Sequence, residues 1–86
     1  MQKEIRVKIK SVNELQFLYL FFQGFKAPIE IANRSYTIDG KSYIGMMSIF
    51  GGSEITAKLL CDDEEEQIRF LKGIKERAEV IDGGNK

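Results

Sequence analysis

Three separated segments of this chain alternate apolar and polar residues, a pattern typical of strands with one buried face and one solvated face. They span residues 4–10, 27–33 and 54–60, and their apolar members are Ile5, Val7 and Ile9, then Ile29 and Ile31, then Ile55, Ala57 and Leu59. Asn33-Arg34 is compatible with a turn, so residues 35–38 are predicted to return as a further strand. We interpret Arg6, Lys8 and Lys10 as a solvated strand face rather than an anion-binding stripe.

The segment after the first strand predicts a helix over residues 14–23 that ends at Gly24. Ser11 and Glu14 have the spacing of a capping box, with Asn13 as an alternative cap. Its predicted core stripe is Leu15, Leu18, Tyr19 and Phe22. Three large apolar residues lie on or near the opposite side, namely Phe17, Leu20 and Phe21. They either form a partner or dimer surface, which we favour, or are covered by other parts of the chain.

Two more helices are expected. Residues 41–49 have apolar residues at helical spacing in Ile44 and Met47, but are too few for a helix without tertiary support, which suggests a short docking element. Residues 62–80 predict a last helix, capped by Asp62 or Asp63, whose acidic first turn and basic later turns suit the helix dipole. Its predicted buried stripe is Ile68, Leu71, Ile74 (or the stem of Lys75) and Ala78.

The element order is therefore βαββαβα in a single domain over residues 1–86, with residues 81–86 as a frayed tail. This order predicts the α+β class, an open-faced β-sandwich with a four-stranded antiparallel sheet and three helices on one face.

Composition excludes several kinds of function. The chain has no histidine, which removes Ser-His and Cys-His nucleophile pairs and most zinc sites. Thirteen basic residues balance thirteen acidic ones, which argues against a nucleic-acid binder. A single cysteine and the lack of a long apolar run or signal-like N-terminus lead us to expect a cytosolic protein without a membrane segment. We expect no metal, no cofactor and no catalytic constellation, since the acidic run at residues 64–66 is better explained by helix capping.

The order of elements and several local motifs resemble HPr, the small phosphocarrier of the bacterial sugar phosphotransferase system. Many HPr proteins of low-GC Gram-positive bacteria carry K-S-I-M-G-V-M-S-L where this chain has Lys41-Ser42-Tyr43-Ile44-Gly45-Met46-Met47-Ser48-Ile49. Gly24-Phe25, Glu54-Ile55-Thr56 and the acidic start of the last helix are also similar. The resemblance covers nearly the whole chain and implies the open-faced sandwich.

The chain departs from the family at the active site. HPr carries a G-[IL]-H-x-R-P signature before its first helix, and its histidine accepts phosphate from enzyme I. Counting back from Gly24, Ser11 falls at the position of the family histidine, Asn13 at the arginine and Glu14 at the proline. None of the three matches, so none receives the family's catalytic role.

The second family site does match. In Gram-positive HPr the serine of K-S-I-M-G is phosphorylated by a kinase and then read by a repressor, and Ser42 occupies that position, with Tyr43, Ile44 and Met47 as adjacent apolar contacts. Ser42 is equally explained as a helix cap. Our hypothesis is a regulatory or protein-binding module of the phosphotransferase or carbon-regulation type that is not a histidine phosphocarrier. The alternatives are a phosphocarrier using another residue such as Ser11, and a structural dimer subunit paired through the first helix.

Overall fold

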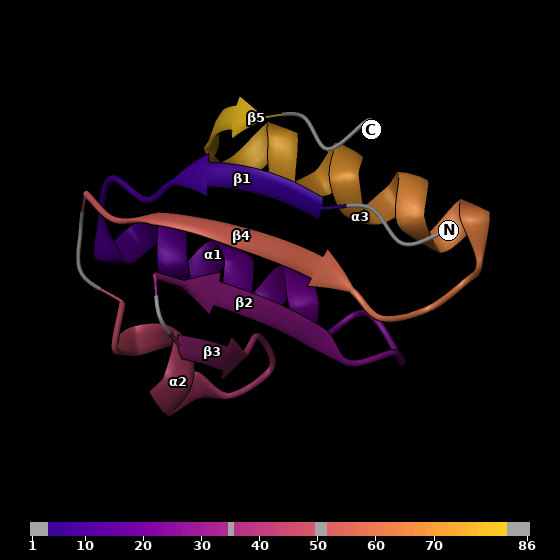
Figure 1. The fold of residues 1–86 in the computed structure, drawn as a ribbon, viewed down its shortest axis with the longest axis horizontal. Helices are drawn as coiled ribbons and strands as arrows, with labels where there is room; N and C mark the ends of the chain where they lie inside the picture. The colour runs from indigo at the N-terminus through magenta and orange to yellow at the C-terminus, as the bar shows by residue number, and fades with distance from the viewer. Residues whose placement is uncertain (1–3, 35, 50–51, 83–86) are drawn as a thin grey trace.

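The computed structural model describes residues 4–34, 36–49 and 52–82. In chain order its elements are β1 (Glu4–Lys8), α1 (Val12–Phe22), β2 (Ile29–Asn33), β3 (Tyr36–Asp39), α2 (Tyr43–Met47), β4 (Glu54–Leu59), α3 (Glu64–Arg77) and β5 (Glu79–Asp82). The strands form one sheet in the order β3-β2-β4-β1-β5, and every neighbouring pair is antiparallel. Figure 1 shows α1 and α3 behind the sheet and α2 beside the edge formed by β3. The predicted α+β open-faced architecture is confirmed.

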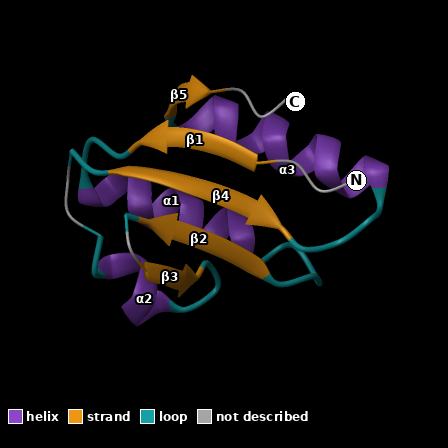
Figure 2. Cartoon of the chain, in the orientation of Figure 1, coloured by secondary structure: helices purple, strands orange, loops and turns teal. Residues whose placement is uncertain are grey.

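The alternating apolar and polar residues of the strands lie on opposite faces of the sheet. In β1 and β4 the apolar side chains are buried, whereas their polar neighbours are exposed or half-buried. Figure 2 shows the helices α1 and α3 together on one face of the sheet. The register places Ile5 opposite Ala57 and Val7 opposite Ile55, so the apolar members of the two strands meet on the covered face. One continuous core cluster joins these side chains to the buried residues of α1, α2 and α3.

The sheet has five strands, so the prediction of four is wrong. Helix α3 ends at Arg77, because Ala78 takes an extended conformation (φ −145°, ψ 161°). The next residues pair with β1, with Glu79 opposite Lys8 and Val80 opposite Val7. Val80 packs partly on the core, which the predicted continuation of the helix would not allow. The expected frayed tail is therefore wrong for residues 81 and 82, and residues 83–86 lie outside the described residues.

Two helices bury a different stripe from the predicted one. In α3 the buried residues are Gln67, Phe70, Leu71, Gly73 and Ile74, whereas Ile68 is exposed. In α2 the buried residue is Met46, while Ile44 is exposed and Met47 is half-buried against the core. The predicted strand from Ser35 is found from Tyr36, and Ser35 lies outside the described residues. No helix in the described part of the chain is long and apolar enough to cross a membrane.

Candidate functional site

The N-terminus of α1, where the family histidine would lie, is closed by the chain's own side chains. Ser11 is the N-cap, and its Oγ accepts a hydrogen bond from the Glu14 backbone N–H at 3.3 Å. In return Glu14 Oε1 accepts from the Lys10 backbone N–H at 2.8 Å, which confirms the predicted capping box and not the alternative cap at Asn13. The Glu14 carboxylate would repel a phosphate there, and Ser11 Oγ already accepts from one of the helix N–H donors that a phosphate would need.

The N-terminus of α2 is organised around Ser42. Ser42 is the N-cap, and its Oγ accepts from the Gly45 backbone N–H at 3.1 Å. Gly45 also permits the close approach of α2 to β3, since a Cβ there would lie 2.6 Å from Ile38 Cγ2. Ser42 is half-buried, and its hydroxyl already has a structural partner in the Gly45 backbone N–H.

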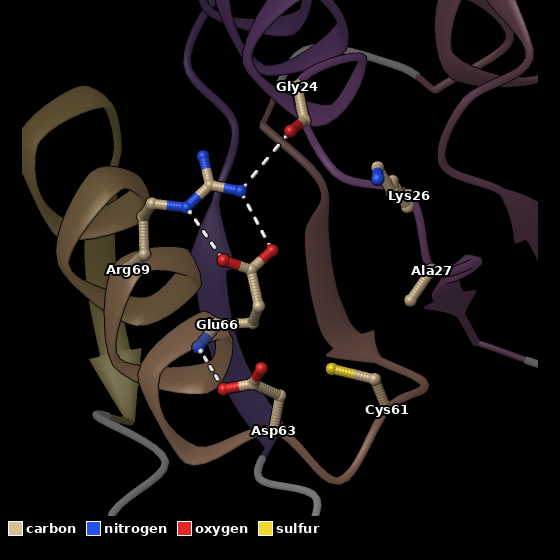
Figure 3. A pocket seen from close by; sticks show the side chains of 7 residues that line it. All are labelled: Gly24, Lys26, Ala27, Cys61, Asp63, Glu66 and Arg69. Atoms are coloured by element: carbon tan, nitrogen blue, oxygen red, sulfur yellow. Dashed lines mark hydrogen bonds and ion pairs between the residues drawn. The ribbon is translucent and has the colours of Figure 1, made fainter.

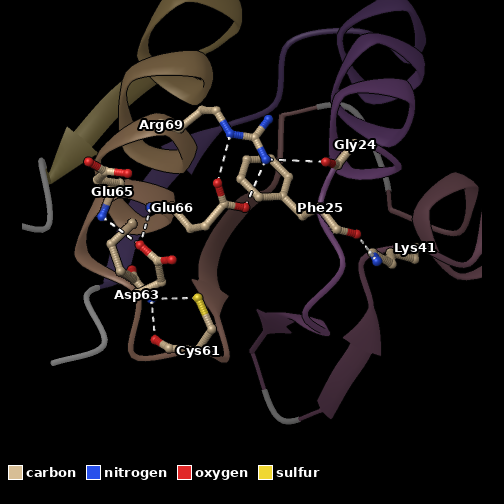
Figure 4. Close-up of polar contacts among 9 residues, drawn as sticks. Gly24, Phe25, Lys41, Cys61, Asp63, Glu65, Glu66 and Arg69 are labelled. Carbon is tan, nitrogen blue, oxygen red and sulfur yellow. Dashed lines mark hydrogen bonds and ion pairs between the residues drawn. The ribbon is translucent and has the colours of Figure 1, made fainter.

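The segment before α2 is fastened to the end of α1. Gln23 Nε2 donates to the Lys41 carbonyl at 3.3 Å and to the Tyr19 carbonyl at 3.1 Å. Lys41 Nζ donates to the Phe25 carbonyl (Figure 4). The rings of Tyr19 and Tyr43 meet edge to face, with centroids 5.3 Å apart. The two helices therefore form one surface, held by contacts that local sequence patterns do not reveal because the bonded residues are far apart in the chain.

Besides Val12 at the first position of α1 (59% exposed), four large apolar side chains are exposed on these two helices, namely Phe17 (58%), Leu20 (65%), Tyr43 (51%) and Ile44 (82%). We call them the α1–α2 surface. The only charged residue of the two helices is Glu14, near the start of α1. Glu76 and Arg77 of α3 lie beside Phe17, where they line a hollow together with it and Glu14. Exposed apolar residues of this size are typical of a surface that binds another macromolecule.

Phe21 was predicted to belong to this surface, but the expectation that it is exposed is wrong. It is half-buried and packs with Phe25 (ring centroids 5.2 Å apart) and with the Arg77 guanidinium, whose Cζ lies 4.5 Å from the ring centroid. It also lies over Gly73, where a Cβ would come within 2.1 Å of Phe21 Cζ. Phe21 therefore joins α1 to α3, and it and the half-buried Met47 are left out of the α1–α2 surface.

A hollow of about 500 Å³ lies between the end of α1 and the start of α3, lined by Gly24, Lys26, Ala27, Cys61, Asp63, Glu66 and Arg69 (Figure 3). Arg69 makes two hydrogen bonds to the Glu66 carboxylate, at 2.8 and 3.2 Å, and one to the Gly24 carbonyl at 3.2 Å. The hydrogen bond to Glu66 raises the pKa of Arg69 above its ordinary value.

Three charged groups of this hollow, those of Asp63, Glu66 and Arg69, are used within the fold. Arg69 also stacks on Phe25, with Cζ 3.9 Å from the ring centroid, and Asp63 caps α3 by accepting from the backbone N–H groups of Glu65 and Glu66 (Figure 4). The arrangement therefore fastens α3 to the end of α1. No group of three Cys, Asp or Glu side chains in residues 4–34, 36–49 and 52–82 could hold a metal ion.

The fold and these two helix N-termini define a small open-faced α+β domain of the phosphocarrier type. Its structure is similar to that of the phosphocarrier protein HPr from Bacillus anthracis str. Ames, with 30% sequence identity, 80% of this chain and 88% of that chain covered, and a TM-score of 0.61. At this identity and coverage, the chain belongs to the HPr-like family. It is also similar in fold to HPr-C-His from Thermoanaerobacter tengcongensis, with 22% identity, 88% of each chain covered and a TM-score of 0.65. No protein-family model and no curated protein matches the chain.

Proposed function

We propose that this chain is a regulatory or protein-binding module of the sugar phosphotransferase or carbon-regulation type, and that it does not carry phosphate on a histidine. The observation that carries the proposal is the α1–α2 surface, which leaves Phe17, Leu20, Tyr43 and Ile44 in water on two helices fastened to each other. The chain lacks histidine, and the capping box fills the site where phosphate would bind. A protein partner on this surface accounts for apolar residues that helix formation itself does not require.

A phosphocarrier that uses another residue is the weaker alternative. Ser11 is exposed at the position of the family histidine, but its hydroxyl already caps α1. Transfer from phosphohistidine to serine gives a low-energy ester that does not pass its phosphate on readily. A carrier of this kind would therefore accept phosphate without returning it.

The first prediction is that phosphoenolpyruvate and enzyme I leave this chain unlabelled, because it has no histidine to accept phosphate. The measurement is incubation with labelled phosphoenolpyruvate and a cognate enzyme I, with an ordinary histidine-containing HPr in the same reaction as the positive control. An acid-labile, base-stable label on this chain would contradict the proposal. An acid-stable label that is lost in Ser11→Ala would instead support the alternative carrier.

The second prediction concerns Ser42. If an HPr-type kinase modifies this chain, we expect a single phosphate on Ser42, where backbone donors and the helix dipole stabilise it. Intact-mass analysis should show the modification in the wild type and its loss in Ser42→Ala. Losing the cap should cost about 1 kcal/mol of folding free energy, so the assay belongs well below the melting temperature.

Ser48→Ala is the matched control, because Ser48 lies at the other end of α2 and its Oγ donates to the Gly45 carbonyl at 2.6 Å. This variant should be labelled like the wild type. Equal labelling of Ser42→Ala and the wild type would place the modification elsewhere.

Self-association is a second candidate role, and the small number of charged residues on α1 and α2 favours it. A two-fold dimer places each surface against its own copy, where like charges would repel one another. Beyond Glu14, the two helices carry no such charges.

A further inference from the structure

The face of the sheet opposite α1 and α3 contains a second hollow, of about 460 Å³, lined by Arg6, Ala32, Arg34, Gly52, Glu54 and Thr56. Figure 1 shows this face in front of the two helices. Arg6 lies directly opposite Thr56, and Thr56 directly opposite Ala32, so the three form one row across β1, β4 and β2. Side chains paired in this way have Cβ atoms roughly 4.5–5.5 Å apart. We call this site the basic hollow.

The tertiary structure brings positive charges from two separate segments together here. Lys8 extends from the same face of β1 as Arg6 and lies opposite Glu54. Arg34 reaches the hollow from the turn after β2, where its backbone is left-handed with φ 57°. Two arginines, Arg6 and Arg34, line the hollow with one carboxylate, that of Glu54, which leaves an excess of one positive charge in its lining. On the other side of β1, Glu79 lies opposite Lys8 and Asp82 opposite Arg6.

These three basic side chains are exposed, and none of the ion pairs among the described residues involves them. Other basic residues of the chain differ in this respect. Lys58 pairs with Glu4 at 3.4 Å, and Arg69 pairs with Glu66 at 2.8 Å. The donors of Arg6 and Arg34 therefore remain available to a ligand.

We propose that the basic hollow binds a phosphate monoester. Guanidinium groups present several N–H donors in a fixed fork that matches phosphate oxygens, and the Thr56 hydroxyl adds a donor between Arg6 and the small side chain of Ala32. A monoester is close to a dianion above pH 7, so it is attracted by the two arginines, which outnumber the one carboxylate in the lining. Glu54 opposes binding and keeps it weak. The site lies on the face opposite the helices, so it does not depend on the role proposed for the α1–α2 surface.

The test is a titration followed by backbone amide chemical shifts at pH 7.5 and low salt. The probes are inorganic phosphate, glucose 6-phosphate and a phosphoserine peptide with neutral flanking residues. We expect saturable shifts at Arg6, Ala32 and Thr56 with at least one of the two esters. The ester that binds more tightly distinguishes a small phosphorylated metabolite from a phosphorylated protein segment.

Three variants make the test specific. Arg34→Asn removes a charge while keeping a residue that tolerates φ 57°, and should weaken binding roughly fivefold, the effect of one unit charge at about 4 Å in water. Glu54→Gln should strengthen binding by a similar factor. Lys72→Gln removes an exposed charge from α3 and should leave binding unchanged. The proposal is overturned if neither ester produces saturable shifts at these residues, or if Arg34→Asn and Lys72→Gln bind equally.

Discussion

Phe70→Ala should cost about 3–5 kcal/mol of the free energy of unfolding. Phe70 is fully buried, and its ring lies between those of Phe22 and Phe25, with centroids 5.7 and 5.6 Å away. Truncation leaves a cavity where α1, α3 and the α1–β2 connection meet. Few of the side chains around this cavity are free to move in and fill it, because they are packed in the core. A domain of this length has a stability of roughly 4–13 kcal/mol in total, so this variant loses a large share of it.

The measurement is thermal and urea unfolding of the wild type and the variant. Each kcal/mol lowers the melting temperature of so small a domain by roughly 4–8 °C, so we expect a fall of at least about 12 °C. Phe17→Ala is the matched control, because it removes the same ring from an exposed position and should change stability by only about 0.5 kcal/mol. Similar losses in the two variants would mean that Phe70 is not the centre of the core.

Local patterns in the sequence sufficed to predict four of the five strands and the cap of α1. The alternation of Ile5 and Val7 fixes which face of β1 is covered, and Ser11 and Glu14 bond to backbone within four residues of themselves. Interactions of this range depend little on the rest of the fold. Because these interactions are local, the periodicity of the sequence and its family resemblance were enough to predict the open-faced sandwich.

The errors have tertiary causes. Helical spacing placed Ile68 in the core, but the buried neighbour is Gln67, whose Nε2 donates to the carbonyls of Leu59 and Cys61, both at 2.8 Å. The side-chain amide of Gln67 can be buried in the core because backbone carbonyls at and after the end of β4 accept its hydrogen bonds. In the same way Val80 continues a helical pattern in the sequence, yet it pairs with Val7 at the free edge of β1. Neither partner is visible from local spacing.

The candidate site was predictable only in part. The exposure of Phe17 and Leu20 followed from the helical wheel, whereas the burial of Phe21 depends on the absence of a side chain at Gly73, on a helix far along the chain. The basic hollow depends on Arg34, which the sequence shows only as a turn residue. Arg6, Lys8 and Lys10 on the first strand did not by themselves predict a binding site. The hollow forms only when the fold brings Arg34 and Arg6 to one concave surface.

The double substitution Phe17→Glu, Leu20→Lys should abolish self-association if the α1–α2 surface pairs with its own copy. Burying a large apolar side chain contributes roughly 1.5–3 kcal/mol, and a two-fold dimer loses each contact twice. Both residues are already more than half exposed in the monomer, so part of this energy is realised only on association. We expect the dimer dissociation constant to rise at least 100-fold, which corresponds to about 2.7 kcal/mol.

Sedimentation velocity over a wide range of concentration measures this directly. Ile68→Lys is the matched control, because Ile68 is a similarly exposed apolar residue (53%) on α3, and it should leave association unchanged. All three proteins should unfold at similar temperatures, since none of the substitutions touches the core. A wild type that stays monomeric at high concentration would exclude the dimer and leave a different protein as the partner of the surface. A double variant that loses stability would show that Phe17 and Leu20 support the fold itself, because an exposed interface residue should not affect the unfolding of the monomer.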